Sequence, residues 1–234
     1  MRSIILRSAF IILFLALNSC STASVKESDF HYKIGVASLS EGNLQSAFVE
    51  FQRALQLNPD NKDALVNLGY IHLQFEEFEK AKGLFLRAVR IDPQFSDAYT
   101  YLGVTYIKMR QWKEAIDPLK KALSNVLYKN PGQAFYYLGM AYYRTGLFDN
   151  AVDAFKDSIK RSPSTPQAYY GLSLAYNKIG RYGDAAAIIE RAIGIDPVFN
   201  SDKAKFITEK KQSLLTSKGE DETDTRDYLE IMRY

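Results

Sequence analysis

The sequence has few of the residues that carry metal, redox or acid–base chemistry. Its 234 residues include one cysteine and two histidines. A single cysteine excludes an internal disulfide and a cysteine-rich metal site. The histidines, His31 and His72, fall at positions where we expect packed side chains. The sequence has no glycine-rich phosphate loop and no nucleophile–base arrangement, so we expect no enzymatic activity, no cofactor and no small-molecule substrate.

The sequence also lacks an excess of charge of one sign. Lys and Arg number 30 and Asp and Glu number 27, which gives a net charge of +3. This charge is too small to indicate nucleic acid as a partner. Aromatic residues are plentiful instead, with 16 tyrosines and 14 phenylalanines beside a single tryptophan. We therefore expect apolar and aromatic surfaces to make any binding site.

The apolar run at the start of the chain is too short to span a bilayer, which takes about 20 residues. It covers the nine residues from Ala9 to Leu17 and follows Arg2 and Arg7. A basic start before a short apolar core is typical of a secretory signal. The run therefore predicts export and not a transmembrane helix.

The only cysteine, Cys20, comes directly after this run. The stretch Leu17-Asn18-Ser19-Cys20 resembles a bacterial lipobox. The resemblance implies that residues 1–19 are a lipoprotein signal peptide and that Cys20 becomes an acylated N-terminus, for example with palmitate. Each buried CH₂ of an acyl chain contributes about 0.8 kcal/mol, so several chains on one residue anchor strongly. The alternative is a plain secretory signal with an unrelated cysteine.

Residues 20–27 are small and polar, which is typical of a short flexible leash between anchor and domain. Ser21, and not aspartate, follows the cysteine. By resemblance to the lipoproteins of Gram-negative bacteria, this residue implies an outer-membrane lipoprotein that faces the periplasm.

The rest of the chain repeats itself with a period of 34 residues. Gly35, Gly69, Gly103 and Gly139 are separated by 34, 34 and 36 residues. The same step relates a series of alanines and several prolines, which are Ala47, Ala81, Ala115, Ala151, Ala185, Pro59, Pro93, Pro163 and Pro197. This pattern resembles the tetratricopeptide repeat. The resemblance implies an all-α superhelix of five helix-turn-helix repeats, at 28–61, 62–95, 96–131, 132–165 and 166–199.

Two departures from the pattern stand out. The fifth repeat has Ser173 where glycine is expected, with Gly171 two residues earlier. The third repeat has two extra residues in its closing loop, around Asn125 to Gly132.

The last segment predicts a cover for the array. Residues 200–216 read as a capping helix with Ser201 or Asp202 as its N-cap. Residues 217–227 are acidic and poor in apolar side chains, so we expect disorder there. Tyr228 to Tyr234 regain apolar character, and we expect a short helix that docks back, with partner recruitment as the alternative. Residues 217–234 are thus predicted to be an acidic tail with a short C-terminal helix.

A binding site is predicted on the concave face, which the first helix of each repeat lines in this family. Repeats that grip a terminal carboxylate place Lys, Asn and Arg at these positions, and this sequence mostly does not. An exposed apolar stripe usually marks a partner site, and tyrosine suits it because its ring is large and rigid. We expect a groove for an extended or helical protein segment, made of Tyr32, Val36, Val66, Tyr70, Leu73, Tyr101, Val104, Ile107, Tyr136, Tyr137, Met140, Tyr143, Tyr170 and Leu174. The alternative is that some of these side chains only pack between adjacent first helices.

The lipobox, the short leash and the lengthened loop together resemble the type IV pilus pilotins of the PilF, PilW and Tgl group. The loop resemblance rests on Leu127, Tyr128 and Pro131, followed by Ala134 and Gly139. It implies a role in pilus assembly, in which a secretin subunit is the protein partner. Two alternatives stay open, a scaffold lipoprotein for envelope enzymes such as peptidoglycan hydrolases, and a periplasmic holdase.

Overall fold

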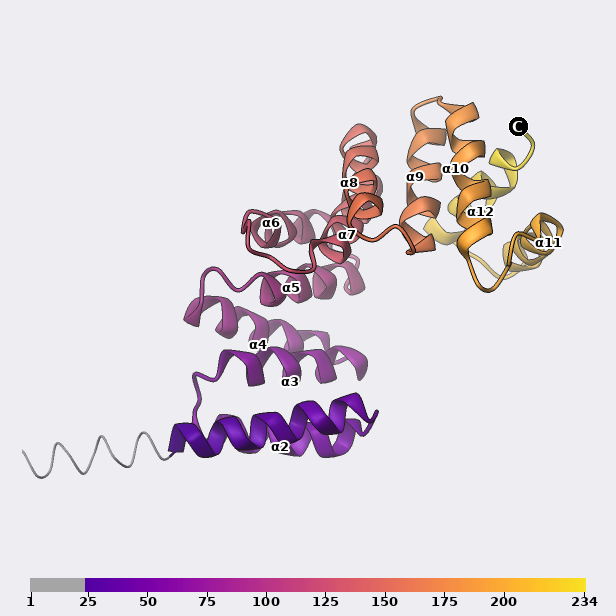
Figure 1. Ribbon diagram of the computed structural model, residues 1–234. Coiled ribbons are helices and arrows are strands. Elements are labelled where there is room, and N and C mark those ends of the chain that lie inside the picture. The colour runs from indigo at the N-terminus through magenta and orange to yellow at the C-terminus, as the bar shows by residue number, and fades with distance from the viewer. Residues whose placement is uncertain (1–23) are drawn as a thin grey trace, which may run out of the picture. The chain divides into compact units, whose positions relative to one another are not determined.

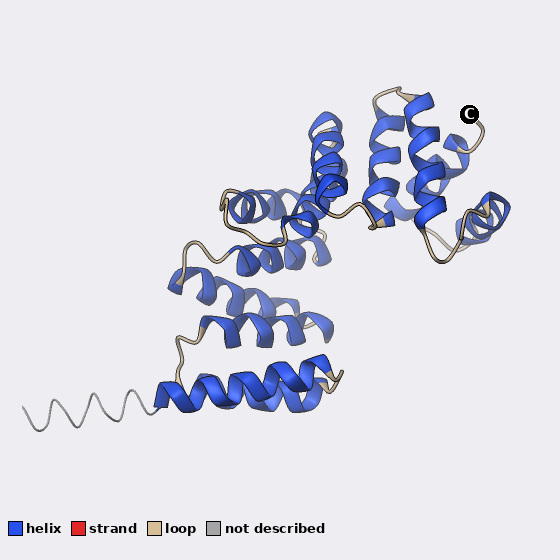
Figure 2. Ribbon diagram, in the orientation of Figure 1, coloured by secondary structure: helices blue, strands red, loops and turns tan. Residues whose placement is uncertain are grey.

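The computed structural model describes residues 24–234, and within that range all regular secondary structure is helical (Figure 2). The all-α fold expected from the sequence is confirmed there. No helix among residues 24–234 has the length and apolar character needed to cross a membrane. Cys20, the stretch that resembles a lipobox and the predicted signal peptide lie outside the described residues.

The helices follow one another along the chain with short connections (Figure 1). The first covers residues 24–40. Those that follow are α2 (Leu44–Leu57), α3 (Lys62–Gln74), α4 (Phe78–Ile91), α5 (Ser96–Lys108), α6 (Trp112–Leu123), α7 (Pro131–Arg144), α8 (Phe148–Arg161), α9 (Pro166–Lys178), α10 (Tyr182–Ile195), α11 (Lys203–Leu214) and α12 (Glu220–Ile231).

The repeated glycines allow a phenylalanine of the second helix to lie against the backbone of the first. A Cβ built on Gly69 would lie 2.6 Å from the Phe85 ring, and one on Gly139 would lie 2.7 Å from the Phe155 ring. Phe85 is fully buried and Phe155 is 1% exposed, so neither ring has room to move away. Glycine recurs once in each of these repeats because the two helices contact each other closely at that position, where a larger residue would not fit.

The fifth repeat keeps this contact in a different register. Gly171 lies against Phe155 of the fourth repeat, where a Cβ would come within 2.5 Å of the ring. Ser173, at the usual glycine position, is fully buried and donates a hydrogen bond to the Tyr170 carbonyl. The residue 16 positions after Ser173 is Ile189, where repeats one, two and four have Phe51, Phe85 and Phe155. Without that ring, the serine side chain is tolerated.

The turn inside each repeat requires one residue with positive φ. Gly42, Gly146 and Gly180 adopt φ of 78°, 79° and 78°. The second and third repeats place Glu76 and Arg110 there, with φ of 59° and 58°. A side chain in this region costs about 1–2 kcal/mol relative to glycine. Those two repeats therefore carry local backbone strain.

The chain divides into two compact units, residues up to Thr105 and residues Tyr106–Tyr234, with the division inside α5. The core of the N-terminal unit gathers Phe51, Leu68, Ile71 and small alanines. Polar groups tie its helices together as well. Asn61 caps α3 by accepting from the Ala64 N–H at 3.0 Å, and its amide donates to Ser28 Oγ at 3.0 Å. Ser28 in turn donates to the Ala54 carbonyl at 2.8 Å.

The C-terminal unit has a larger core that continues into the last two helices. It joins Phe155, Leu172 and Ile189 to Phe206 of α11 and Ile231 of α12. Phe206 and Ile231 are fully buried. Asp202 is the N-cap of α11 and accepts from the Lys205 N–H at 2.9 Å. The last repeat is therefore covered by α11 and α12 together.

The expectation of disorder over residues 217–227 is wrong. The α-helix α12 begins at Glu220, and Thr225 and Asp227 are buried. Glu220, Asp224 and Asp227 are paired with cations of the repeats, so the segment is not a free polyanion. The last residues pack back on the repeats, since the Tyr234 ring stacks on the Tyr182 ring of α10 with ring centroids 5.0 Å apart.

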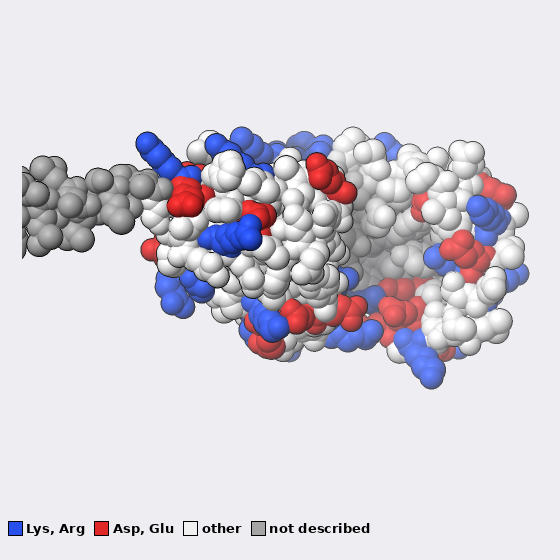
Figure 3. All heavy atoms as spheres, turned by 90° about the horizontal axis from the view of Figure 1, so that it is seen from below, with Lys and Arg blue, Asp and Glu red and all other residues white. Residues whose placement is uncertain are grey.

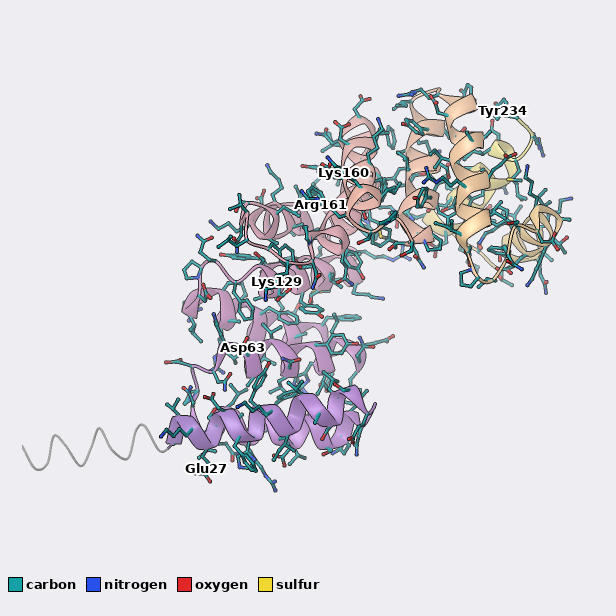
Figure 4. All side chains as sticks on the ribbon, viewed as in Figure 1. Glu27, Asp63, Lys129, Lys160, Arg161 and Tyr234 are labelled. Carbon is teal, nitrogen blue, oxygen red and sulfur yellow. The ribbon has the colours of Figure 1, made fainter. Side chains whose placement is uncertain are left out.

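The lengthened loop of the third repeat covers residues 124–130 and carries Lys129, which Figure 4 labels. Val126 and Leu127 on this loop are 94% and 82% exposed. Tyr128 instead packs against the neighbouring core of the C-terminal unit. The loop is thus fixed by one aromatic side chain and presents two apolar ones to solvent.

Candidate functional site

An open pocket of about 690 Å³ lies in the C-terminal unit, between the end of α5 and the first helices of repeats four and five. Side chains from α12 close one side of it. We call it the open pocket, and its lining includes Lys108, Arg110, Trp112, Gln133, Tyr136, Tyr137, Met140, Arg144, Gln167, Glu220 and Asp221. Aromatic and basic side chains thus share one concave surface.

Helix α7 supplies the aromatic part of this surface. Tyr136, Tyr137 and Met140 lie within two turns of one helix and are each partly buried. The Tyr136 and Tyr137 rings contact each other at 5.1 Å. Burial, with a smaller effect of Tyr137, raises the pKa of Tyr136 to about 12. The Tyr136 ring is thus neutral at ordinary pH, and both rings offer a flat apolar area with a polar tip.

Arg144 is the centre of the basic part. Its guanidinium lies 5.8 Å from the Trp112 ring and 5.4 Å from the Tyr143 ring. It donates two hydrogen bonds to Asp224 of α12, at 2.9 Å and 2.6 Å. Burial lowers the pKa of Arg144, but the hydrogen bonds and charges of Asp224 and Glu220 outweigh that effect, so its pKa stays above the usual value. The side chain is therefore held charged between two aromatic rings.

Arg110 extends the basic surface from a strained position. Its φ is 58°, and its guanidinium lies 3.2 Å from the Glu220 carboxylate. Three of the five repeats have glycine here, so an arginine is not required by the turn. Glu76 has the same strained conformation at the matching turn of repeat two, so the strain belongs to the turn. Arg110 contributes to the pocket through its charge.

The C-terminal helix covers the neighbouring part of the same face. The residues that hold it are Tyr143, Arg144, Tyr170 and Lys178, which we call the α12-binding surface. Lys178 Nζ lies 2.5 Å from Asp227, and the Tyr143 hydroxyl donates to Asp224 at 3.1 Å. The Tyr170 ring contacts the Tyr228 ring at 5.8 Å. This surface thus binds both the carboxylates and the aromatic ring of α12.

The buried tyrosines of this surface resist ionisation. Burial raises the pKa of Tyr143 well above its usual value, and Asp224 and Asp227 raise it further. Burial and a hydrogen bond to Asp196 do the same for the pKa of Tyr170. Burial also raises the pKa of Tyr228, with Asp224 as the largest charged contributor. A negative charge on any of these rings would meet a carboxylate in a dry environment.

The structure brings together four predicted groove residues at the open pocket, which are Ile107, Tyr136, Tyr137 and Met140, although Ile107 is only 6% exposed. Tyr170 is partly buried and contacts α12. The exposure expected for six residues is wrong, since each is only 4–9% exposed, namely Val66, Leu73, Val104, Ile107, Tyr143 and Leu174. Of these, Tyr143 is covered by α12, to which its hydroxyl donates a hydrogen bond. Apolar side chains at these positions pack between neighbouring helices and leave the accessible positions to longer ones.

The remaining predicted residues belong to the N-terminal unit and are partly buried. Tyr32 and Val36 pack against the core of that unit. The Tyr101 ring stacks on Phe85 at 5.6 Å and contacts Tyr70 at 5.7 Å. The structure therefore uses these aromatic side chains largely to join adjacent repeats.

The basic half of the site was not among the residues predicted from the sequence. Arg144 and Lys178 occupy concave positions of repeats four and five, but their importance appears only with the carboxylates that oppose them. Trp112 and Arg110 lie at the turn of the third repeat, which the concave pattern does not include. The single tryptophan of the sequence was the one signal that pointed to this turn.

The histidines have structural partners. His31 Nδ1 lies 2.6 Å from a Glu50 carboxylate oxygen, and His72 pairs with Glu77. Over residues 24–234, no group of three or more His, Cys, Asp or Glu side chains is arranged to hold a metal ion.

The surface charge is mixed. Figure 3 shows Lys and Arg interspersed with Asp and Glu on the face that it views.

Comparison with solved structures gives a consistent fold. MamA, known from a crystal structure, is 25% identical in sequence to this chain, with a TM-score of 0.62. The match covers 77% of this chain and 96% of the MamA chain. YrrB, described as a tetratricopeptide protein with an unusual peptide-binding site, is 24% identical, with a TM-score of 0.61 over 77% of this chain and 90% of its own. PilF of Pseudomonas aeruginosa is 18% identical, with a TM-score of 0.69 over 88% of this chain and 98% of its own. At such identities the last two show the fold alone.

Sequence comparison identifies the repeats themselves. No curated protein matches the chain. Three models of the tetratricopeptide repeat do match, over residues 38–94, 84–117 and 136–198, and together they cover more than half of the chain. The chain therefore belongs to the tetratricopeptide repeat family.

Proposed function

We propose that this chain is a membrane-tethered adaptor that binds a protein partner and assists secretin assembly in type IV pilus biogenesis. The open pocket carries the proposal. Its rings, Tyr136, Tyr137 and Trp112, lie beside the cations Lys108 and Arg110 on one concave surface. A surface of this kind suits a protein segment, because aromatic and arginine side chains dominate the energetics of protein interfaces. A peptide-binding site described for YrrB, which shares the fold, supports the same use.

The tether belongs to the proposal through the sequence. The lipobox at residues 17–20 would place acyl chains on Cys20. An adaptor held at the membrane raises the local concentration of its partner there, which favours assembly without any new chemistry. Metabolic labelling with palmitate tests this step, and we expect label on the wild-type chain and none on Cys20→Ser.

The exposed loop of the third repeat offers a second contact. Val126 and Leu127 are the two most exposed apolar side chains of the loop. Leu127 also belongs to the Leu127-Tyr128 pair that resembles the pilotin loop. Exposed apolar side chains that lie together often mark a protein interface. The pilotin proposal rests on this loop, on the lipobox and on the fold shared with PilF.

The deciding experiment is a deletion strain in which heat-resistant secretin multimers are counted in the outer membrane. We expect the multimers to disappear while the monomer remains. The wild-type gene should restore them, and Val126→Ser with Leu127→Ser should not, whereas Lys129→Ser on the same loop should restore them. Normal multimer levels in the deletion strain would overturn the pilotin proposal.

Two other functions are separable by cross-linking in the same strain. Capture of peptidoglycan hydrolases with an intact secretin would identify an envelope scaffold. Capture of many unfolded exported chains, with no preferred partner, would identify a holdase.

A further inference from the structure

The helix α12 meets the repeats through an unusual set of side chains. The residues that face the repeats are Glu220, Asp224, Asp227, Tyr228 and Ile231. Their spacing of i, i+4, i+7, i+8 and i+11 forms one stripe along a helix. A helix that merely covers a core would be expected to carry apolar residues along this stripe. Here the first three positions are carboxylates.

Each carboxylate has a basic partner on the repeats. Glu220 is opposite Arg110 at 3.2 Å, Asp224 is opposite Arg144 at 2.6 Å, and Asp227 is opposite Lys178 at 2.5 Å. Arg144 and Lys178 lie at matching positions of repeats four and five, 34 residues apart. The period of the repeats thus produces a ladder of positive charge, and α12 presents a complementary ladder of negative charge.

The outer face of α12 is solvent-exposed and mixed in charge. Thr223, Arg226 and Glu230 are exposed, and Arg226 pairs with Glu222 on the helix itself. The connection that leads into α12 is exposed too, and the side chain of Leu215 on it is 84% exposed. Gly219, the residue before α12, has a positive φ of 59°. The helix is therefore held by its inner stripe and by a short exposed link.

Part of the same face stays uncovered. The open pocket adjoins the first turn of α12, where Glu220 and Asp221 form part of its lining. The Arg110–Glu220 pair at this end is 64% and 36% exposed, so it contributes little to stability because water competes for both charges. A second helix with the same stripe would exchange the ion pairs of α12 for equivalent ones.

We infer that α12 is an internal occupant of the partner site in repeats four and five. The partner is an acidic amphipathic helix with carboxylates at i, i+4 and i+7 and an aromatic residue at i+8, and it takes the place of α12. This inference rests on the proposed adaptor function and names the chemistry of the partner segment. It explains why a segment of acidic composition is folded against concave positions of the array.

A labelled synthetic peptide of residues 218–234 is the probe for this exchange. In the wild-type chain the internal copy competes at an effective concentration on the order of millimolar, so the peptide binds poorly. In the full chain with Asp224→Asn and Asp227→Asn the internal copy loses two charges and keeps Tyr228 and Ile231. We expect the Kd of this variant for the peptide to be at least about tenfold lower than that of wild type.

The matched control removes two carboxylates from the rest of the same helix. Glu222→Gln with Glu230→Gln should bind the peptide no better than wild type. Adding Arg144→Met to the Asp224→Asn and Asp227→Asn chain should abolish the gain. Equal affinity of the two double variants, with helix content retained in circular dichroism, would overturn the inference.

A second measurement decides the question if the double variant fails to fold. A protease site inserted at residues 216–218 of the otherwise wild-type chain allows α12 to be cut from its link after folding. Exchange of the cut helix for labelled peptide, with the repeats still helical, supports the inference. Loss of helicity of the repeats when the cut helix leaves would show a structural cap and overturn it.

The two proposals fail separately. Normal secretin multimers in the deletion strain would remove the secretin as partner but leave peptide exchange unaffected. No exchange, together with lost multimers on deletion, would keep the pilotin function and remove only the role of α12. A dimer of the double variant that swaps α12 between two copies, detected by light scattering, would identify a second copy as the occupant and overturn the assignment to a separate partner.

Discussion

Arg144 and Asp224 form a two-point ion pair although they lie 80 residues apart in the chain, with N–O distances of 2.9 Å and 2.6 Å. Their side chains are only 14% and 16% exposed. The guanidinium fork matches both carboxylate oxygens, which makes this geometry stronger than a single-point contact. The pair joins α12 to the end of α7 and fixes the position of the C-terminal helix.

Removing this arginine is expected to destabilise the C-terminal unit. Arg144→Met leaves Asp224 partly buried without its cation, so we expect the free energy of unfolding to fall by about 2 kcal/mol. Urea unfolding followed by circular dichroism measures the loss. Arg226→Met, which removes an exposed pair with Glu222, should cost at most about 0.5 kcal/mol. Equal losses in the two variants would contradict the structural role of the Arg144 pair.

Two glycines of the N-terminal unit should respond in opposite directions to alanine. At Gly69 the added Cβ would lie 2.6 Å from the buried Phe85 ring, and we expect a loss of about 1–3 kcal/mol from overpacking. At Gly83, inside α4, the added Cβ meets nothing within 4 Å. Gly83→Ala should therefore raise stability by about 0.5–1 kcal/mol, because alanine favours a helix over glycine. Thermal unfolding of both variants checks the signs, and a stabilised Gly69→Ala would disprove the close contact.

The two asparagine N-caps of the same unit differ in whether the side chain makes a second hydrogen bond. Asn43 accepts only from the Ser46 N–H, whereas Asn61 also donates its amide to the fully buried Ser28 hydroxyl. Asn43→Ala should cost about 1 kcal/mol, as a cap alone does. Asn61→Ala should cost about 1 kcal/mol more, because it leaves a buried hydroxyl short of a partner. Urea midpoints that agree for the two variants would mean that the Ser28 contact adds nothing.

Alkaline pH is expected to unfold the C-terminal unit. The pKa of Tyr136 is raised to about 12, and burial raises the pKa values of Tyr143, Tyr170 and Tyr228 as well. An unfolded tyrosine ionises near pH 10, at about its ordinary pKa. The folded state thus holds these protons more tightly, so stability is complete below about pH 10 and falls as the pH rises through the folded pKa values.

The measurement follows tyrosinate absorbance and helix content together as the pH rises. We expect a late group of tyrosines to ionise only as helicity is lost. Tyr228→Phe should move the midpoint of this transition to higher pH, and Tyr234→Phe, at a 63% exposed position, should leave it unchanged. Ionisation of every tyrosine near pH 10 with the helices intact would contradict the burial of these hydroxyls.

Much of the fold could be predicted from the period of the sequence. Gly69 and Phe85 recur at fixed positions because each repeat must bring two helices into the same close contact. That requirement is local, and a single sequence displays it by repetition. The departure at Ser173 was visible too, but its reason was not, since it depends on Gly171 lying against Phe155 of the preceding repeat.

The candidate site was predicted only in part. Tyr136, Tyr137 and Met140 line the open pocket as the concave positions suggested. Leu73 and Val104 occupy concave positions as well but are buried, at 7% and 5% exposure. Position within a repeat places a side chain on a helix face, but the neighbouring helices decide how much of that face stays accessible.

The sequence by itself determined the family and the helix pairs, because each depends on residues close together in the chain or repeated at a constant step. Only the tertiary structure decided the state of the acidic tail. In the sequence, five of the eight residues from Glu220 to Asp227 are acidic, and these carboxylates should repel one another and stay solvated. Folding places Arg110, Arg144 and Lys178 opposite three of those carboxylates, from positions about 50 to 110 residues away. A charge is costly or stabilising according to what faces it in space, and the order of residues along the chain does not contain that information.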